Sequence, residues 1–154
     1  MNTKISFIQC GGTIDKGYPQ GLTDHGYAFK IEEPATISIL ERAKPQIEID
    51  MHEVLRKDSL DMDQADRDTI KAYVENIEND KIILTHGTDT MSLTAEDISS
   101  IKDKTIVLTG SMLPERFRNT DADFNLGMAI GGVQVLPHGT YIALQGKLVK
   151  WDEF

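Results

Sequence analysis

The sequence holds a single cysteine among its 154 residues and no apolar run close to the ~20 residues that cross a membrane. A lone cysteine cannot form an internal disulfide, which excludes the disulfide-rich domains of oxidising compartments. Cys10-Gly11-Gly12 interrupts the first apolar run after a few residues, too early for the core of a secretory signal peptide. We therefore expect a cytoplasmic protein without a membrane partner.

Positive charge is also scarce. The sequence has 16 lysines and arginines and 25 aspartates and glutamates, which gives a net charge of −9. A surface of this sign repels phosphate backbones, so nucleic acid is not an expected partner. Histidine and cysteine do not recur at the spacing of a metal site, and the glycines match neither a Walker loop nor a dinucleotide fingerprint. We expect no metal and no cofactor, and a small molecule as the ligand.

What the sequence does contain is an alternation of apolar runs with helical patterns, sufficient for a single domain over residues 1–154. The apolar runs predict strands at 4–9, 46–54, 81–85, 105–109 and 140–145. The helical patterns predict helices at 34–43, 63–79, 92–101 and 121–135. Runs that are continuously apolar fit parallel strands buried on both faces. We predict an open, mostly parallel α/β sheet with helices on both faces.

Two threonines in glycine-rich settings are the main chemical signal. Thr13 follows Gly11-Gly12 and Thr88 follows Gly87, each just after a predicted strand. The carboxyl ends of parallel strands lie side by side, and ligands bind there. A threonine hydroxyl becomes a nucleophile when a base takes its proton and nearby amides hold the developing oxyanion. A tight turn with a capping threonine explains Gly-Gly-Thr as well.

Charged and polar residues near these threonines are further candidates for the site. Asp89 suits a substrate ammonium, although Asp89 or Thr90 also fits a cap of the following helix. His86 invites a general-base role, but a histidine at the end of a buried strand is often structural. Ser59, with free amides before the helix at residue 63, suits a substrate carboxylate, and capping explains Ser59 as well.

The segment 17–30 contains glycines, a proline and two tyrosines, Tyr18 and Tyr27, without sustained periodicity. It predicts a loop that begins shortly after Thr13. A mobile lid and a plain solvated connection are both consistent with it.

Together these segments resemble the bacterial-type L-asparaginase family, specifically its N-terminal domain and most closely its short-chain members. The matching pieces run in the family's order and cover nearly the whole chain: Gly11-Gly12-Thr13-Ile14, Lys57-Asp58-Ser59-Leu60-Asp61, Thr85-His86-Gly87-Thr88-Asp89-Thr90-Met91, Thr109-Gly110-Ser111-Met112-Leu113-Pro114 and Asp123-Phe124-Asn125-Leu126-Gly127. The resemblance implies a Rossmann-like or flavodoxin-like fold and the hydrolysis of asparagine to aspartate and ammonia.

The resemblance also implies roles for individual residues. The implied catalytic set is Thr13, Tyr18, Thr88, Asp89 and Lys150. Thr13 is the nucleophile of an acyl-enzyme, and Tyr18, which fits the short-chain spacing better than Tyr27, helps to deprotonate it. Thr88 works with Asp89 and a lysine, for which Lys150 is the nearest candidate.

The substrate-binding set that the resemblance implies is Asp58, Ser59, Gly87, Thr88, Asp89 and Ser111. In it Asp89 binds the ammonium, and Ser59 with Asp58 holds the α-carboxylate end. Two other functions remain open: a non-catalytic aspartate- or asparagine-binding protein of the same fold, and a subunit of a larger amidase. Under each of them we expect a homo-oligomer, a dimer or a tetramer.

Overall fold

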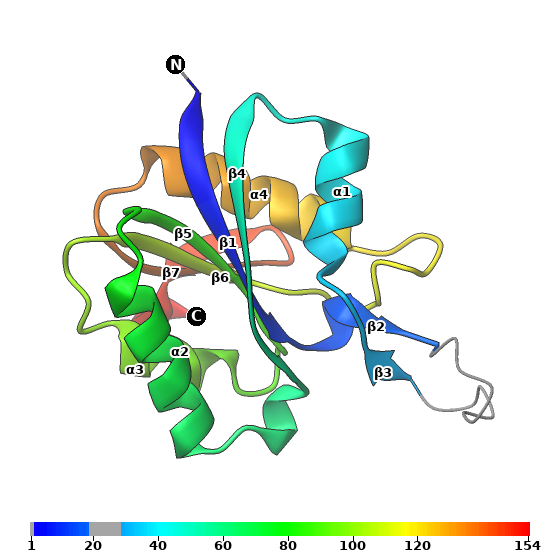
Figure 1. Cartoon of the computed structure of the whole chain (residues 1–154), viewed down its shortest axis with the longest axis horizontal. Coiled ribbons are helices and arrows are strands. Elements are labelled where there is room, and N and C mark those ends of the chain that lie inside the picture. Colours follow the sequence, from blue (N-terminus) through cyan, green and yellow to red (C-terminus); the bar gives the residue numbers. More distant parts are fainter. Residues whose placement is uncertain (1, 19–28) are drawn as a thin grey trace.

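The computed structural model describes residues 2–18 and 29–154, which form a six-stranded sheet covered by helices (Figure 1). The strands run in the order β4-β1-β5-β6-β7-β8. Their bounds are β1 Thr3–Gly11, β4 Ile47–Lys57, β5 Lys81–Thr85, β6 Thr105–Thr109, β7 Gly139–Leu144 and β8 Lys147–Lys150. All neighbours are parallel except β7 and β8. The predicted α/β fold class is confirmed.

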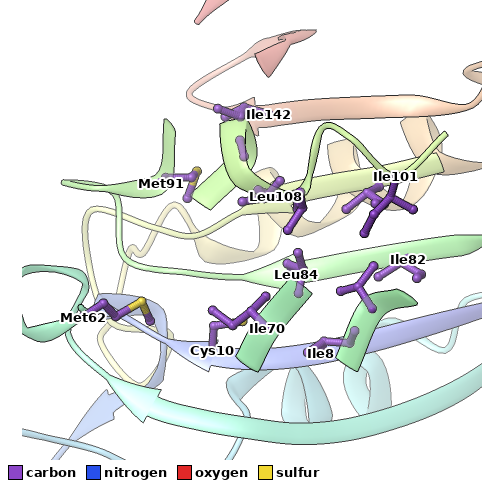
Figure 2. Close-up of a cluster of buried hydrophobic side chains, with 14 of the residues drawn as sticks. Ile8, Cys10, Met62, Ile70, Ile82, Leu84, Met91, Ile101, Leu108 and Ile142 are labelled. Carbon is purple, nitrogen blue, oxygen red and sulfur yellow. The ribbon is translucent and has the colours of Figure 1, made fainter. Parts of the chain in front are cut away.

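Four helices in the described part of the chain cover both faces of this sheet. They are α1 Ala35–Ala43, α2 Gln64–Asn76, α3 Met91–Ile98 and α4 Ala122–Val135. Alternate strand residues point to opposite faces. Ile8, Leu84 and Leu108 therefore pack under α2 and α3, as Figure 2 shows for part of this cluster. Phe7, Ile83 and Val107 pack under α1 and α4 on the other face.

The predicted helices agree with the observed ones to within a few residues, and β8 is the strand of the main sheet that the sequence did not predict. Gln145 and Gly146 both have positive φ, 51° and 81°. Two such residues in succession make the tight turn of a β-hairpin. The chain therefore reverses after β7, and Lys147–Lys150 pairs back against it.

The predicted loop 17–30 lies largely outside the described residues, which omit 19–28. At its two ends the chain forms a short antiparallel ladder of β2 (Lys16–Gly17) and β3 (Lys30–Ile31).

The order of the strands places a topological switch point, where sheets of this kind form a ligand crevice, next to β1. From β1 the chain crosses to β4 on one side, and it later returns to β5 on the other side. Loops that leave neighbouring strands in opposite directions open a ligand site at the carboxyl ends of those strands. Thr13 follows β1 and Thr88 follows β5. No helix within 2–18 and 29–154 has the length and apolar composition to cross a membrane.

Candidate active site

The loops that carry the two threonines touch through their glycine backbones. A Cβ added to Gly12 would lie 2.6 Å from the Gly87 Cα and 2.7 Å from the His86 carbonyl carbon. Gly12 also has a φ of 92°, in the region that favours glycine. Only a residue without a side chain allows the backbone after β1 to approach the backbone after β5 this closely. The two glycines therefore bring together the loops in which Thr13 and Thr88 are the next residues.

Both threonine side chains are half-buried and Asp89 is exposed. Within the described ranges, neither hydroxyl and neither Asp89 oxygen hydrogen-bonds to another residue. The neighbouring Thr90, by contrast, donates its hydroxyl to the Ser59 carbonyl at 2.9 Å. Thr90 is thus a structural residue, whereas Thr13, Thr88 and Asp89 keep their polar atoms available to a ligand.

His86 is structural rather than a base that faces the crevice. Its ring is fully buried, and its Nδ1 lies 2.7 Å from the Gly87 carbonyl oxygen. Because a carbonyl only accepts, Nδ1 carries the proton and Nε2 accepts from the Thr94 hydroxyl at 2.7 Å. Burial lowers the pKa of His86 from 6.5 to about 4, so the ring is neutral near pH 7. Both nitrogens hold the loop after β5 in place.

The structure places Asp58, which was expected at the substrate carboxylate, in an ion pair with Lys16. Its Oδ2 accepts a hydrogen bond from Lys16 Nζ at 2.8 Å, and its Oδ1 accepts from the Leu60 amide at 3.3 Å. The Lys16 contact lowers the pKa of Asp58, so this carboxyl stays ionised. A fixed anion repels the α-carboxylate of an amino acid. Asp58 instead ties the loop after β4 to the loop after Thr13.

Ser59 is fully buried, so its hydroxyl supports the loops from behind. A Cβ on Gly87 would lie 2.6 Å from the Ser59 Oγ, and this Oγ accepts from the Thr90 amide at 3.4 Å. The amides expected to be free at the start of α2 are also engaged. Asp63 and Asp66 form a capping box there, with the Asp66 amide 2.9 Å from Asp63 Oδ1. The capping box thus engages the Asp63 and Asp66 amides at the start of α2.

Ser111 and Gly87 are buried, and each contributes to the shape of its loop. The Ser111 hydroxyl donates to the Leu113 carbonyl within the turn after β6. The Asp121 carboxylate accepts from the Met112 and Leu113 amides at 2.9 and 3.0 Å. This turn is thus closed by its own hydrogen bonds.

Lys150 does not lie with Thr88 and Asp89. It pairs with Tyr141 on the outer edge of the sheet, whereas Thr85 lies level with Ala143, nearer the carboxyl ends. Lys150 also lines a hollow of about 300 Å³ with Pro137 and His138, which precede β7. The hairpin turn points β8 away from the crevice, so we remove Lys150 from the site.

Tyr18 is the last residue described before the segment 19–28, and it is 57% exposed. It packs on Phe29 with ring centroids 4.6 Å apart, and Phe29 packs on Phe117 at 5.3 Å. The structure thus groups Tyr18 with two other aromatic rings rather than against Thr13. Tyr27, its alternative, lies outside the described residues.

A buried carboxylate beneath Thr13 was missed by the sequence interpretation. Asp15 has no exposed surface, and its oxygens accept from the Ala35 amide at 2.7 Å and from Gln9 Nε2 at 3.1 Å. Burial raises the pKa of Asp15 from 3.8 to about 6. It fixes the Thr13 turn to the first amide of α1. Nothing local in Thr13-Ile14-Asp15 signals this, because Ala35 lies 20 residues further along.

A cysteine nucleophile and a metal site have less support at the carboxyl ends of the strands. Cys10 is buried, and burial with nearby Asp15 raises the pKa of its thiol, which keeps it unreactive. Among the described residues no three histidine, cysteine, aspartate or glutamate side chains gather as a metal site would require. The hydroxyls of Thr13 and Thr88 remain the candidate nucleophile and proton carrier.

The fold and these two loops define a doubly wound α/β protein with a ligand crevice at its switch point. A family model described as Asparaginase, N-terminal matches residues 4–150. The chain therefore belongs to the asparaginase family, as the resemblance predicted.

Relatives from two organisms agree with this assignment. The L-asparaginase of Thermococcus kodakarensis is 32% identical over 152 residues, and the alignment covers 95% of this chain and 45% of that protein. Its solved structure matches with a TM-score of 0.82, at 30% identity over 97% of this chain and 46% of that one. L-asparaginase 2 of Escherichia coli is 28% identical over 130 residues, which cover 82% of this chain and 37% of the relative.

The structure of L-asparaginase I from Vibrio cholerae has the same fold, with a TM-score of 0.78 at 22% identity over 98% of this chain and 47% of that one. The chain spans less than half the length of each of these relatives.

Proposed function

We propose that this protein hydrolyses the side-chain amide of L-asparagine through a threonine ester. The observation that carries the proposal is the contact of Gly12 with Gly87, because Thr13 and Thr88 directly follow these two glycines. Membership of the asparaginase family and the names of the relatives support the substrate.

In the proposed first step, Thr13 Oγ1 attacks the carbonyl carbon of the amide. The carbon–nitrogen bond breaks, and the nitrogen leaves as ammonia with the proton of the hydroxyl. Water then attacks the ester, its proton returns to Thr13 Oγ1, and aspartate leaves. Thr88 relays protons in both steps.

The zwitterionic substrate needs one anionic contact, which the exposed Asp89 carboxylate supplies to the α-ammonium. Ser59 acts indirectly, by fixing Gly87 and Thr90 so that the backbone of this loop stays close to the substrate. Binding energy at Asp89 orients the amide toward Thr13, and orientation of this kind lowers the barrier to attack.

The proposal is tested by offering asparagine and glutamine in parallel, with and without hydroxylamine. Hydroxylamine competes with water for an ester, so an acyl-enzyme yields aspartyl hydroxamate in addition to ammonia. We expect ammonia from asparagine and hydroxamate in proportion to hydroxylamine. Ammonia release without any hydroxamate would retain the amidase and reject the ester.

A further inference from the structure

We propose that Tyr73 is a nucleophilic tyrosine that accepts an acyl group from an activated ester, with His52 as its base and Asp50 as the residue that orients this base. Asp50 and His52 belong to β4, the outer strand of the sheet, and Tyr73 belongs to the last turn of α2 (Figure 1). A hydroxyl bonded to an imidazole that is itself held by a carboxylate is the arrangement that activates a hydroxyl nucleophile.

The hydrogen bonds within this group assign a role to each nitrogen of His52. Its Nε2 lies 2.8 Å from Asp50 Oδ2, and its Nδ1 lies 2.8 Å from the Tyr73 hydroxyl. Because a carboxylate only accepts, Nε2 carries the proton and Nδ1 holds the lone pair that accepts from Tyr73. Nδ1 is therefore in position to take the phenolic proton when the Tyr73 oxygen attacks a carbonyl carbon.

The sequence of β4 puts the base and its carboxylate on one face of the sheet. Asp50 and His52 are two residues apart in a strand, so their side chains leave it on the same side. The buried Ser6 of the neighbouring strand donates its hydroxyl to Asp50 Oδ2 at 2.8 Å. The hydrogen bond from His52 is the main reason that the pKa of Asp50 lies below its usual value. Asp50 thus stays charged, and it stabilises the imidazolium that forms when His52 takes a proton.

The surroundings of Tyr73 indicate which acyl group it accepts. Tyr73 is 37% exposed, and its ring meets the His52 ring edge to face, with centroids 5.5 Å apart. A hollow of about 540 Å³ lies beside Tyr73, lined in part by Ala72 and Ile77. Apolar walls suit a hydrocarbon chain. The acyl donor is thus an ester with a good leaving group and an apolar acyl chain.

In the proposed step, the Tyr73 oxygen attacks the carbonyl carbon of the ester, and its proton passes to His52 Nδ1. The bond from this carbon to the leaving oxygen breaks, and the alcohol leaves with the proton that His52 held. An acyl ester of Tyr73 remains, and no other reactant is consumed. If Tyr73 served only to link α2 to β4, its partial burial would make it less reactive than a more exposed tyrosine.

Acylation by p-nitrophenyl acetate, mapped by mass spectrometry of tryptic peptides, tests the proposal on the purified chain. Tyr18 is the internal reference, because it is 57% exposed and its hydroxyl has no hydrogen-bond partner within 2–18 and 29–154. Residues 72–81 form a tryptic peptide in which Tyr73 has the only hydroxyl side chain. We expect Tyr73 to react at least about tenfold faster than Tyr18. Hydroxylamine should then remove the acetyl group, since it cleaves an ester and leaves a lysine amide intact.

A substitution at the base separates this assignment from a structural role. His52→Gln keeps a polar side chain without a base, so acylation of Tyr73 should slow about 10- to 100-fold while Tyr18 reacts as before. His138→Gln is the matched control, since His138 also lies near a carboxylate, 3.3 Å from Asp80, but precedes β7. It should leave the Tyr73 rate unchanged, and circular dichroism checks that both variants are folded.

Two further comparisons test the carboxylate and the hollow. Asp50→Asn removes the charge that orients His52, so it should slow acylation of Tyr73 at least about tenfold. The ratio of Tyr73 to Tyr18 labelling should rise when p-nitrophenyl butyrate replaces the acetate, and a constant ratio contradicts the role of the hollow. Equal rates at the two tyrosines of the wild type overturn the proposal, as does an unchanged Tyr73 rate in His52→Gln.

Discussion

At the residue scale, Thr88 and Asp89 are neighbours in the chain with different expected tasks. Asp89 is exposed, and we propose that it binds the substrate ammonium, so Asp89→Asn should raise KM about 10- to 100-fold and change kcat little. Thr88 is half-buried, and we propose that it relays protons, so Thr88→Val should lower kcat about 100-fold or more at similar KM. Steady-state kinetics with asparagine separates the two effects.

Asp97→Asn is the matched control for the loss of a carboxylate. Asp97 lies on α3 and accepts a hydrogen bond from Gln64 Nε2 at 2.9 Å, away from the crevice. It should leave both kinetic constants unchanged. If Asp89→Asn lowers kcat and leaves KM untouched, the ammonium role assigned to Asp89 is incorrect.

At the element scale, the site depends on the close exit of β1 and β5. Gly12→Ala places a Cβ 2.6 Å from the Gly87 Cα at a φ of 92°. Backbone strain and overpacking each cost about 1 to 3 kcal/mol, so we expect a loss of about 3 kcal/mol or more in the free energy of unfolding. Urea denaturation measures this loss, and ammonia release should fall with it.

Gly131→Ala is the corresponding control, because Gly131 lies inside α4 with no atom within 4 Å of a Cβ at that position. Alanine in a helix interior should stabilise the fold by about 0.5 to 1 kcal/mol. Equal stability of the two variants would show that β1 and β5 tolerate a wider separation than the site requires.

The apolar pattern predicts most elements and the edge at which the site lies. Continuous apolar runs such as Ile82–Leu84 are sufficient to identify buried parallel strands, and parallel strands bring their carboxyl ends together. The apolar pattern does not mark the turn at Gln145-Gly146, so β8 was not predicted, and Lys150, the nearest candidate for the family lysine, belongs to that strand.

Contacts between distant residues could not be predicted in the same way. Lys16 and Asp58 are 42 residues apart in the sequence. Gly87 packs against Ser59, which belongs to a different loop. Local propensity carries no information about such pairs. The sequence motif places Ser59 after a predicted strand, but it does not reveal whether the Ser59 hydroxyl faces solvent or the protein interior.

At the scale of the whole molecule, two buried groups oppose each other in the dependence of stability on pH. Between 3.8 and about 6, folded Asp15 keeps a proton that the unfolded chain has released, so its contribution falls as pH rises. Between 6.5 and about 4, the unfolded chain protonates His86 and the folded protein does not, so the His86 contribution falls as pH drops. The two slopes nearly cancel.

Removal of either Asp15 or His86 should reveal the pH dependence of stability that the other residue causes. Asp15→Asn should lose about 3 kcal/mol of stability between pH 6.5 and pH 4, because His86 then acts alone. His86→Asn, which keeps a donor toward the Gly87 carbonyl, should instead lose stability as pH rises toward 6. Urea denaturation at a series of pH values gives both slopes. Parallel curves for wild type and Asp15→Asn would contradict this assignment.

The most direct test of the proposed site compares ammonia release from asparagine by the wild-type chain and by Thr13→Val. Valine keeps the shape of threonine without the hydroxyl, and Thr69→Val, on the exposed side of α2, is the matched control. We predict release by wild type and Thr69→Val, and a loss of at least about 1,000-fold in Thr13→Val. No release by the wild type at neutral or mildly alkaline pH, or equal release by Thr13→Val, would contradict the account.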